Sequence, residues 1–277
     1  MRIFEFHFNP PAKNEMPDRL FDSFCYEPKN VYEKRLGSLY MVGEVFNVLP
    51  QNLQLLYKIS QIIKEKYYNL TLQTPEKSFK GALKAVNEFL EKEITKNNVS
   101  WLGNLNLTVL SLVSNDLGET FTLNLSKVGN AKIFSERKGK ITNLGKNLDL
   151  EGIEPYPLKV FTNIVTGRIG QGDKIAILTS GLFDFFSVPS FSEEKAGSKE
   201  SLLDKLLKAE LGKEKQVREL LQKKGEEISG INGILLLIDS TKELPASRKV
   251  LTFKKELEKF SFKEIFIPLS KILISFL

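Results

Sequence analysis

Two hydrophobic periodicities, and the order in which they follow one another, constrain the fold of this 277-residue chain. Apolar and polar residues alternate along Arg2–Phe8, which predicts a strand that a pair of prolines ends. Residues Phe21–Tyr26 and Ser38–Val45 have the character of two further strands. From residue 50 onwards the apolar residues recur every three or four positions, which is the stripe of an amphipathic helix. The chain therefore begins with strands and then turns helical.

Two amphipathic helices are expected in direct succession. The first covers Pro50–Tyr68, and the second is expected to be capped at Ser78. Their apolar stripes are Leu53, Leu56, Ile59, Ile63 and Tyr67 in the first helix, and Phe79, Leu83, Val86, Leu90 and Ile94 in the second.

The remainder of the chain up to residue 240 is expected to be mostly strands. These strands are Leu102–Val113, Phe121–Leu125, a hairpin of Ala131–Ser135 with Ile141–Leu144, Val160–Thr166, Lys174–Thr179 and Gly233–Ile238. Two short helices, Leu202–Leu207 and Val217–Ile228, precede the last strand. Because helices come in pairs between runs of strands, the chain lacks the strand–helix alternation of a doubly wound fold. This order favours antiparallel sheets covered by helices, which is the α+β class.

Residue composition argues against several kinds of site. A single cysteine, Cys25, excludes an intramolecular disulfide and a cysteine-based zinc site. A single histidine, His7, argues against serine–histidine catalysis and histidine-rich metal sites. We expect Cys25 to be a small buried side chain and His7 to be a strand residue with a half-exposed ring.

The net charge of +6 is concentrated towards the C-terminus. Residues 242–271 contain eight Lys or Arg and four acids, an excess of four positive charges. The rest of the chain is nearly balanced, so we expect no basic face for nucleic acid. The N-terminus lacks the unbroken apolar run of a signal peptide, and the body of the chain is therefore expected to be cytoplasmic.

The last segment, residues 241–277, is expected to be a basic linker followed by an amphipathic helix. Apolar residues recur from Phe262 to Phe276, although Pro268 would bend or restart such a helix. The residues expected to contact a membrane or a partner are Phe262, Phe266, Leu269 and Leu273. Three alternatives remain open: packing on the main fold, lying at a membrane surface as a peripheral anchor, and beginning a longer membrane span.

Residues 1–240 resemble the metal-dependent serine/threonine protein phosphatases, the PPM or type 2C family. The segment Lys127–Phe134 (KVGNAKIF) matches the family's Val-Gly-Asp-Ser-Arg strand and hairpin. The segment Gly172–Asp184 (GDKIAILTSGLFD) matches its Gly-Asp, apolar strand, Thr-Asp-Gly-Leu and later Asp. Ile231–Ile238 (INGILLLI) lies where the family has Asp-Asn before its last core strand, and Leu39–Val45 (LYMVGEV) where it has a strand ending in Asp-Gly. The resemblance implies a four-layer αββα sandwich of two antiparallel sheets covered by helix pairs.

The resemblance also implies a site for two or more Mn²⁺ or Mg²⁺ ions that activate a bridging water. Such hard cations need oxygen ligands, chiefly carboxylates. In this chain the family's acids are replaced by Asn130, Ser180 and Ile231, the last of which is followed by Asn232. We therefore expect these to be degenerate ligand positions, with no cofactor bound unless the chain is active.

Three acids are candidates for remnants of the metal site. They are Glu44, Asp173 and Asp184; the family's upstream Asn-Glu-Asp has Glu33 as its nearest acid here. For each, the alternative is structural: Asp173 as turn chemistry before a strand, Asp184 as a turn cap or exposed residue, and Glu44 as a polar residue of a residual cleft.

Three functional hypotheses follow. The first is a non-catalytic phosphatase-like domain that binds a protein partner, such as a phosphoprotein or a kinase. The second is an active, divergent phosphatase with Glu44, Asp173 and Asp184 around one Mn²⁺ or Mg²⁺ ion. The third is an unrelated structural or membrane-tethered sensory domain. We favour the first because the ligand carboxylates are missing while the order of elements is kept.

Overall fold

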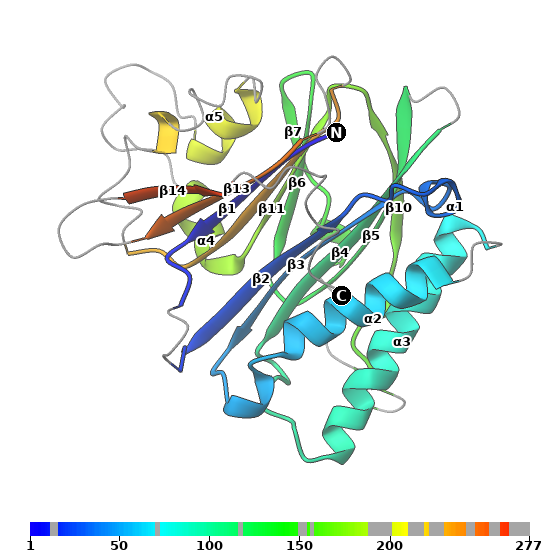
Figure 1. The fold of residues 1–277 in the computed structure, drawn as a ribbon. Coiled ribbons are helices and arrows are strands. Elements are labelled where there is room, and N and C mark those ends of the chain that lie inside the picture. Colours follow the sequence, from blue (N-terminus) through cyan, green and yellow to red (C-terminus); the bar gives the residue numbers. More distant parts are fainter. Residues whose placement is uncertain are drawn as a thin grey trace. The chain divides into compact units, whose positions relative to one another are not determined.

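The computed structural model describes most of the chain: residues 1–11, 16–69, 73–115, 119–148, 154–155, 158–187, 201–209, 219–221, 230–241, 247–254 and 261–265. These residues belong to two compact units. The seven-stranded unit consists of residues 1–10, 132–144 and 172–277, and the five-stranded unit of residues 11–131 and 145–171. Figure 1 draws both as ribbons with their elements labelled.

The five-stranded unit is built on an antiparallel sheet with the order β10-β5-β4-β3-β2. Its strands are β2 (Arg19–Tyr26), β3 (Ser38–Phe46), β4 (Leu105–Ser114), β5 (Thr120–Val128) and β10 (Val165–Gly170). Short elements complete the unit: α1 (Val31–Lys34), the 3-10 turns η1 (Pro50–Asn52) and η2 (Lys146–Leu148), and the small pair β8 (Glu154–Pro155) and β9 (Leu158–Lys159).

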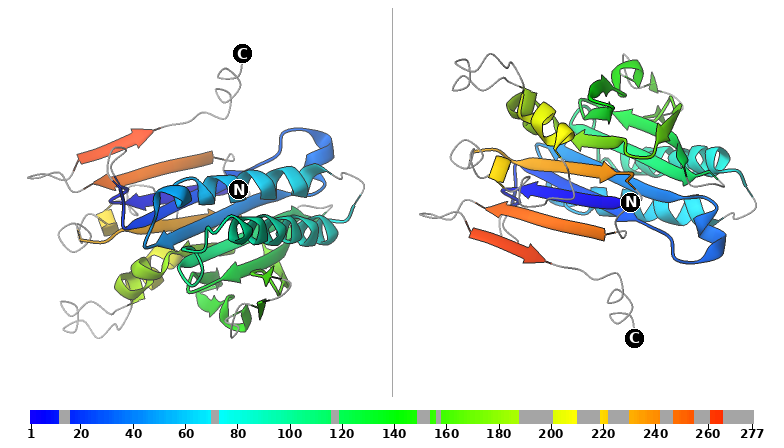
Figure 2. Two further views of the ribbon diagram at one scale, coloured as in Figure 1. Left: turned by 90° about the horizontal axis from the view of Figure 1, so that it is seen from below. Right: turned by 90° about the horizontal axis from the view of Figure 1, so that it is seen from above.

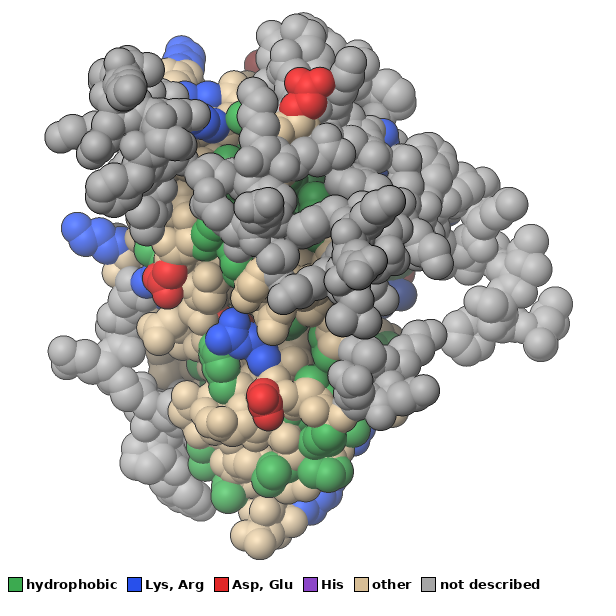
Figure 3. All heavy atoms as spheres, turned by 90° about the vertical axis from the view of Figure 1, so that its left-hand side faces the viewer, with side chains coloured by type: hydrophobic (Ala, Val, Ile, Leu, Met, Phe, Trp, Pro, Cys, Tyr) green, Lys and Arg blue, Asp and Glu red, His purple; other side chains and the backbone are tan. Residues whose placement is uncertain are grey.

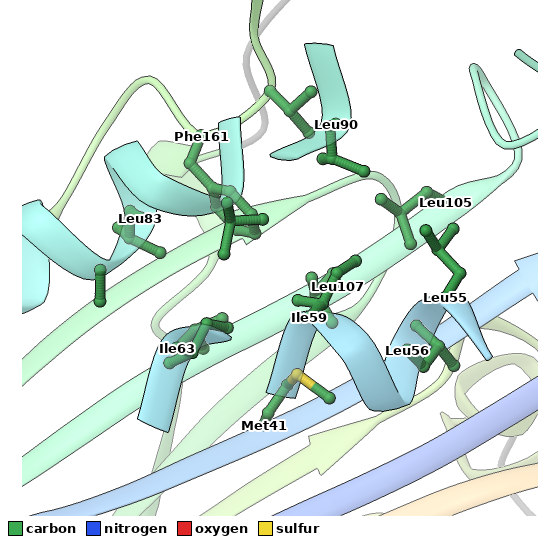
Figure 4. Packing of buried hydrophobic residues seen from close by; sticks show 14 of the residues in the cluster. Met41, Leu55, Leu56, Ile59, Ile63, Leu83, Leu90, Leu105, Leu107 and Phe161 are labelled. Atoms are coloured by element: carbon green, nitrogen blue, oxygen red, sulfur yellow. The ribbon is translucent and has the colours of Figure 1, made fainter. Parts of the chain in front are cut away.

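Two long helices, α2 (Leu55–Asn69) and α3 (Pro75–Thr95), pack side by side over one face of this sheet (Figures 1 and 2). Their apolar stripes share one buried cluster with side chains of β3 and β4, and Figure 4 shows Ile59 and Leu107 among its members. A Cβ on Gly43 of β3 would lie 2.7 Å from carbon atoms of both Leu56 and Leu107. Gly43 thus lets α2 approach the β3 backbone, and the neighbouring Glu44 lies on the opposite face of the sheet.

The seven-stranded unit has the strand order β14-β13-β1-β12-β11-β6-β7. Its strands are β1 (Arg2–Phe8), β6 (Lys132–Arg137), β7 (Lys140–Asn143), β11 (Lys174–Leu178), β12 (Gly233–Asp239), β13 (Ser247–Lys254) and β14 (Ser261–Ile265). Neighbours are antiparallel except β1 and β13, which run parallel.

Helices α4 (Ser180–Ser187) and α5 (Leu202–Lys208) cover one face of this second sheet. Their leucines and phenylalanines share a buried cluster with Phe4, Phe6 and Phe8 of β1. Ser201 begins α5 with a capping box to Asp204. At the other end, the Lys174 ammonium donates to the carbonyls of Leu207 and Ala209 at 2.6 and 2.7 Å. The last carbonyls of α5 are therefore satisfied by a side chain of the sheet.

The α+β class expected from the sequence is confirmed, since each sheet carries a pair of helices on one face. Most strands expected from alternation are present with shifts of a few residues at their ends. The hairpin expected at residues 131–144 is formed by β6 and β7. Of the helix expected at Val217–Ile228, only residues 219–221 are described, and they are helical.

Two local predictions were wrong. Thr74, not Ser78, caps α3, because the chain turns into the helix at Pro75 and leaves Ser78 buried one turn inside it. The strand expected at Val160–Thr166 begins only at Val165. The side chain of Asn87 on α3 accepts from the backbone N–H groups of residues 160 and 161, which holds this segment against the helix instead of the sheet.

The C-terminal segment differs most from its prediction. Residues 247–254, expected to belong to a linker, form β13, and Phe262 lies in strand β14, where it pairs with Phe253. A helix through Phe262 is therefore wrong, because the backbone of residues 261–265 is bonded to the sheet. Phe266, Leu269 and Leu273 lie outside the described residues. None of the helices among the described residues is long and apolar enough to cross a membrane.

Candidate functional site

In the five-stranded unit, one buried asparagine links two of the expected ligand positions. Glu44 on β3 faces Asn106 on β4, and the Asn106 amide donates to Glu44 Oε1 at 2.9 Å. The Oδ1 atom of Asn106 accepts from the backbone N–H of Asn130 at 2.9 Å. Glu44 is fully buried and Asn106 nearly so. The side-chain amide of Asn106 therefore uses both ends to join the Glu44 carboxylate to the turn after β5.

That turn has a tightly fixed backbone. Gly129 adopts φ +70°, and a Cβ there would lie 1.9 Å from Asn106 Oδ1. Beside it, the buried ammonium of Lys127 donates to the carbonyls of Gly129 and Ala131, each at 3.2 Å. The carbonyls on both sides of Asn130 are thus held by a cation from the chain itself.

In the seven-stranded unit, the expected positions Ser180, Ile231 and Asn232 lie near the end of β11 and the start of β12. Thr179 Oγ1 accepts from the Ile234 N–H at 3.1 Å, and the Thr179 N–H donates to the Ile234 carbonyl at 3.1 Å. A Cβ on Gly233 would lie 2.2 Å from Thr179 Oγ1. The Thr179 hydroxyl and the absence of a side chain at Gly233 therefore allow the end of β11 and the start of β12 to pack closely.

Around this junction, Ser180 starts α4 and the Asn232 side chain is exposed. Ile231 packs against the buried cluster under α4 and α5, while its carbonyl accepts from Asn9 Nδ2 at 2.8 Å. The position of Ile231 is thus used for hydrophobic packing.

Asp173 belongs to a different part of the unit. It precedes β11 and is separated from Ser180 by this whole five-residue strand, roughly 17 Å. Its buried carboxylate forms an ion pair with the exposed Arg137, at 2.7 Å from Nε and 2.6 Å from Nη2. These hydrogen bonds raise the pKa of the Arg137 guanidinium. The Asp173 carbonyl also accepts from the Ser240 N–H and hydroxyl. Asp173 is therefore a turn residue, as its structural alternative proposed.

Asp184 and His7 have ordinary environments. Asp184 is exposed on α4, and its carbonyl accepts from the Ser187 hydroxyl. His7 lies on β1 with an intermediate exposure. Burial lowers the pKa of its imidazole from about 6.5, while the nearby Glu5 opposes this shift. Cys25 is buried on β2, as expected.

Several large apolar side chains are exposed on the described surface. The large apolar side chains exposed on it are Met16, Val31, Tyr32, Leu49, Leu53, Tyr57 and Val99. On the face drawn in Figure 3, apolar side chains lie among polar surface and a few charged side chains over the described part. Isolated exposed apolar residues of this kind are normal on a soluble surface and identify no site by themselves.

Sequence reasoning missed three residues that organise these positions. Asn106, Lys127 and Thr179 were not singled out, although Lys127 and Thr179 lie inside the quoted motifs. An asparagine and a lysine within otherwise apolar or alternating strands are a signal of buried polar pairing. Their partners lie 62, 2 and 55 residues away for Asn106, Lys127 and Thr179, so only the fold reveals two of the three pairings.

Solved structures with the same arrangement are bacterial phosphatase domains. A serine/threonine phosphatase from S. agalactiae has a TM-score of 0.50 and 13% identity, covering 87% of this chain and 99% of its own. The PP2C phosphatase domain of SpoIIE from Bacillus subtilis, solved with a fragment of its regulatory domain, has a TM-score of 0.50 and 12% identity, covering 88% of this chain and 64% of its own.

The chain has the PP2C-type phosphatase fold. The catalytic domain of the phosphatase PstP, solved in complex with two manganese ions, has a TM-score of 0.47 and 12% identity, covering 87% of this chain and 98% of its own. By sequence, the chain matches no protein-family model and no curated protein. At these sequence identities the likeness shows the PP2C fold alone, and the chemistry must be argued from the residues of this chain.

The residues at the expected ligand positions do not fit the metal centre that a PP2C fold implies. Ile231 offers an alkyl side chain, Ser180 a hydroxyl and Asn130 an amide, none of which is a carboxylate. The Asp173 carboxylate is committed to Arg137 at the far end of β11. Among the residues that the structure describes, no group of three or more His, Cys, Asp or Glu side chains lies close enough to hold a metal ion.

Proposed function

We propose that this chain is a non-catalytic PP2C-like domain that acts as a binding or regulatory module. The observation that carries the proposal is the use of the expected ligand positions for other interactions. Ile231 packs in the hydrophobic cluster, Asp173 pairs with Arg137, and Asn130 is bonded through its backbone to Asn106. A metal centre would need the Asp173 carboxylate to leave Arg137, and it would find no donor atom in the Ile231 side chain.

The electrostatics of two neighbouring dications support this proposal. Two doubly charged ions repel strongly unless several carboxylates neutralise them at close range. Replacing an acidic ligand by isoleucine removes both a negative charge and a donor atom. Water cannot compensate, because it supplies no negative charge and an alkyl group excludes it from the position. The PP2C fold is thus retained without the charges that its hydrolytic chemistry requires.

The partner class that we propose is a protein, such as a phosphoprotein or a kinase. A domain with the phosphatase fold but without its metal ligands would still present a folded surface to a protein partner. The residues proposed for a membrane contact, Phe266, Leu269 and Leu273, lie outside the described residues and give this proposal no support.

Hydrolysis of p-nitrophenyl phosphate tests the proposal against the active alternative. The full chain is assayed with and without Mn²⁺, beside an active metal-dependent phosphatase of the same fold as a positive control. We expect the rate with Mn²⁺ to equal the rate without protein, because no dinuclear centre forms to activate water.

The contradicting result is Mn²⁺-dependent hydrolysis that the Glu44→Gln variant loses. Glutamine keeps an oxygen that can accept from Asn106, so this change removes the charge while retaining the buried hydrogen bond. Glu88→Gln is the matched control, because Glu88 is an exposed acid on α3 that belongs to no candidate metal site. Circular dichroism of each variant shows that the compared chains are folded.

A further inference from the structure

The turn between β2 and β3 carries the two most exposed large apolar side chains of the described residues. They are Val31 and Tyr32, which are 73% and 70% exposed. Both lie on the short helix α1, none of whose residues is buried. Exposed apolar side chains alone indicate no site, and the backbone and the charges of this turn supply the further observations.

The start of α1 is fixed by two side chains. The Asn30 side chain caps α1 by accepting from the Glu33 N–H at 2.8 Å. The Tyr26 hydroxyl, from the adjacent strand β2, donates to Glu33 Oε2 at 2.6 Å. Burial, together with this hydrogen bond, raises the pKa of Tyr26 to about 12. The phenol therefore keeps its proton at neutral pH and remains the donor that joins α1 to β2.

The end of the turn is fixed from α2. The Tyr67 hydroxyl donates to the Leu36 carbonyl, and the Tyr68 hydroxyl donates to the Gly37 carbonyl at 2.7 Å. Both tyrosines are buried. A Cβ on Gly37, which has φ +80°, would lie 2.2 Å from the Leu112 carbonyl oxygen. The backbone that presents α1 is therefore held at both of its ends.

Two exposed cations flank the apolar side chains of α1. In a helical turn, side chains three and four residues apart are neighbours. Val31 therefore neighbours Lys34 and Arg35, and Tyr32 neighbours Arg35, which has helical backbone angles at the C-cap of α1. Lys34 and Arg35 are both exposed. The exposed side of α1 thus combines an aromatic ring, an aliphatic group, an ammonium and a guanidinium.

The one acid of α1, Glu33, is bound to β2. Glu33 is also the only acid of residues 29–35, and it is half-buried with its carboxylate at the Tyr26 hydroxyl. Lys64 of α2 has its Nζ atom 4.2 Å from the centre of the Tyr26 ring, which places a further cation beside that pair. The charge of Glu33 is therefore engaged at β2, whereas Lys34 and Arg35 are directed to solvent.

We infer that the exposed side of α1, formed by Val31, Tyr32, Lys34 and Arg35 and called the α1 surface, docks an acidic segment of a protein partner. The inference rests on the proposed function, because it names the surface that such a binding module uses. Tyrosine and arginine often dominate the energy of protein interfaces, and here they are neighbours. A backbone that is fixed before binding lowers the entropy that docking costs. Carboxylates of the partner complement the two cations.

An anionic membrane is the other kind of surface that attracts cations. Peripheral attachment generally takes an extended apolar helix face or a cluster of about four to eight Lys or Arg residues. The α1 surface offers two apolar side chains and two cations on a single helical turn. A protein segment, which needs only a few matched groups, therefore fits it better than a lipid surface does.

Fluorescence anisotropy of the full chain with a short labelled peptide of Glu, Leu and Gly tests the inference. We expect saturable binding of this peptide, and none of a matched peptide with Lys in place of Glu. The double variant Lys34→Glu/Arg35→Glu is expected to weaken binding by about tenfold or more, because each new carboxylate repels the peptide. Tyr32→Ala is expected to weaken it by a similar factor, because the ring is the largest apolar group of the α1 surface.

A matched charge reversal on α3 separates the α1 surface from net charge. Lys84→Glu/Lys92→Glu changes two exposed lysines and alters the net charge by the same amount. It is expected to change binding by about twofold or less, because salt screens exposed charges that lie away from the peptide. Every changed residue is exposed, and circular dichroism of each variant shows that the compared chains are folded.

Equal binding by the wild type and by Lys34→Glu/Arg35→Glu overturns the inference, and so does the absence of saturable binding by the wild type. Sedimentation with vesicles of phosphatidylcholine and phosphatidylserine tests the membrane alternative. Vesicle binding that the charge reversal abolishes, without peptide binding, also overturns the inference. The Mn²⁺-dependent assay tests the proposed function separately, because hydrolysis contradicts the non-catalytic role whatever the peptide does. A chain that neither hydrolyses phosphate esters nor binds the peptide contradicts only the role of the α1 surface.

Discussion

Ile231 stands where the family resemblance implies an acidic ligand, and its alkyl side chain has no atom that could bind a metal ion. Its side chain packs with the cluster beneath α4 and α5, so hydrophobic burial stabilises the fold where an acid would need solvation or a cation. At position 130 an asparagine stands where the resemblance implies an acid, and its backbone N–H donates to Asn106 Oδ1. Single replacements of this kind leave the backbone in place while removing the negative charge.

At the same scale, Gly129 is predicted to be intolerant of a side chain. We expect Gly129→Ala to lower the free energy of unfolding by about 2–3 kcal/mol, from a positive φ and from displacement of Asn106. Gly139→Ala is the matched control, because Gly139 has φ +81° but no atom within 4 Å of its Cβ position. It is expected to cost about 1 kcal/mol. Urea unfolding measures both; equal losses would contradict the steric role of Asn106.

The candidate ligand positions were expected from the family resemblance, and they stay a prediction. The positions of Ser180, Ile231 and Asn130 could be identified because they replace acids in short ordered motifs. The role of Asp173 could not be settled, because its ion pair with Arg137 joins residues that lie 36 positions apart. Likewise, the contact of Glu44 with Asn106 depends on the register of β3 and β4, which no local pattern specifies.

At the scale of elements, β13 extends the sheet by pairing in parallel with β1. An ion pair joins the two strands: Arg248 Nε contacts Glu5 Oε1, and Arg248 Nη2 lies 3.3 Å from Glu5 Oε2. Glu5 is 1% exposed, so this bidentate contact compensates a carboxylate within the sheet. β13 is therefore fixed by a charge pair as well as by its backbone ladder.

We predict that Arg248→Met loosens β13 before it loosens the rest of the sheet. Hydrogen exchange of the β13 amides is expected to accelerate by about tenfold or more, which corresponds to a loss of about 1.4 kcal/mol. The exchange of β11, on the other side of β12, is expected to change little. Glu5→Gln/Arg248→Met should restore part of the protection, because the buried charge is then absent. Equal acceleration in β11 and β13 would contradict a local role.

Prediction of the helices and strands succeeded where a hydrophobic pattern extended over many residues, and it failed near the C-terminus. The stripes of α2 and α3 and the alternating phenylalanines of β1 specified those elements because the side chains of each pattern share one buried cluster. Phe262 and its neighbours were assigned to a helix from their spacing, whereas pairing of residues 261–265 with β13 makes them a strand. A five-residue stretch is too short for period alone to decide, and tertiary pairing determines its structure.

At the scale of the whole molecule, the chain has the PP2C fold, and we propose that it keeps this fold without the metal chemistry. Residues 1–240 contain the segments on which the family resemblance was based, and the fold class expected from them is confirmed at 12–13% identity to known structures. Fold depends on many apolar positions that tolerate substitution, whereas a metal centre depends on a few carboxylates. A sequence can therefore diverge in its ligands while it keeps both helix-covered sheets.

Isothermal titration calorimetry of the full chain with Mn²⁺ tests most directly the claim that this chain holds no dinuclear metal centre. We predict no saturable binding up to millimolar Mn²⁺, with the same heats for wild type and for Glu44→Gln. Binding of two Mn²⁺ ions per chain at millimolar or lower concentration, abolished by Glu44→Gln, would contradict it.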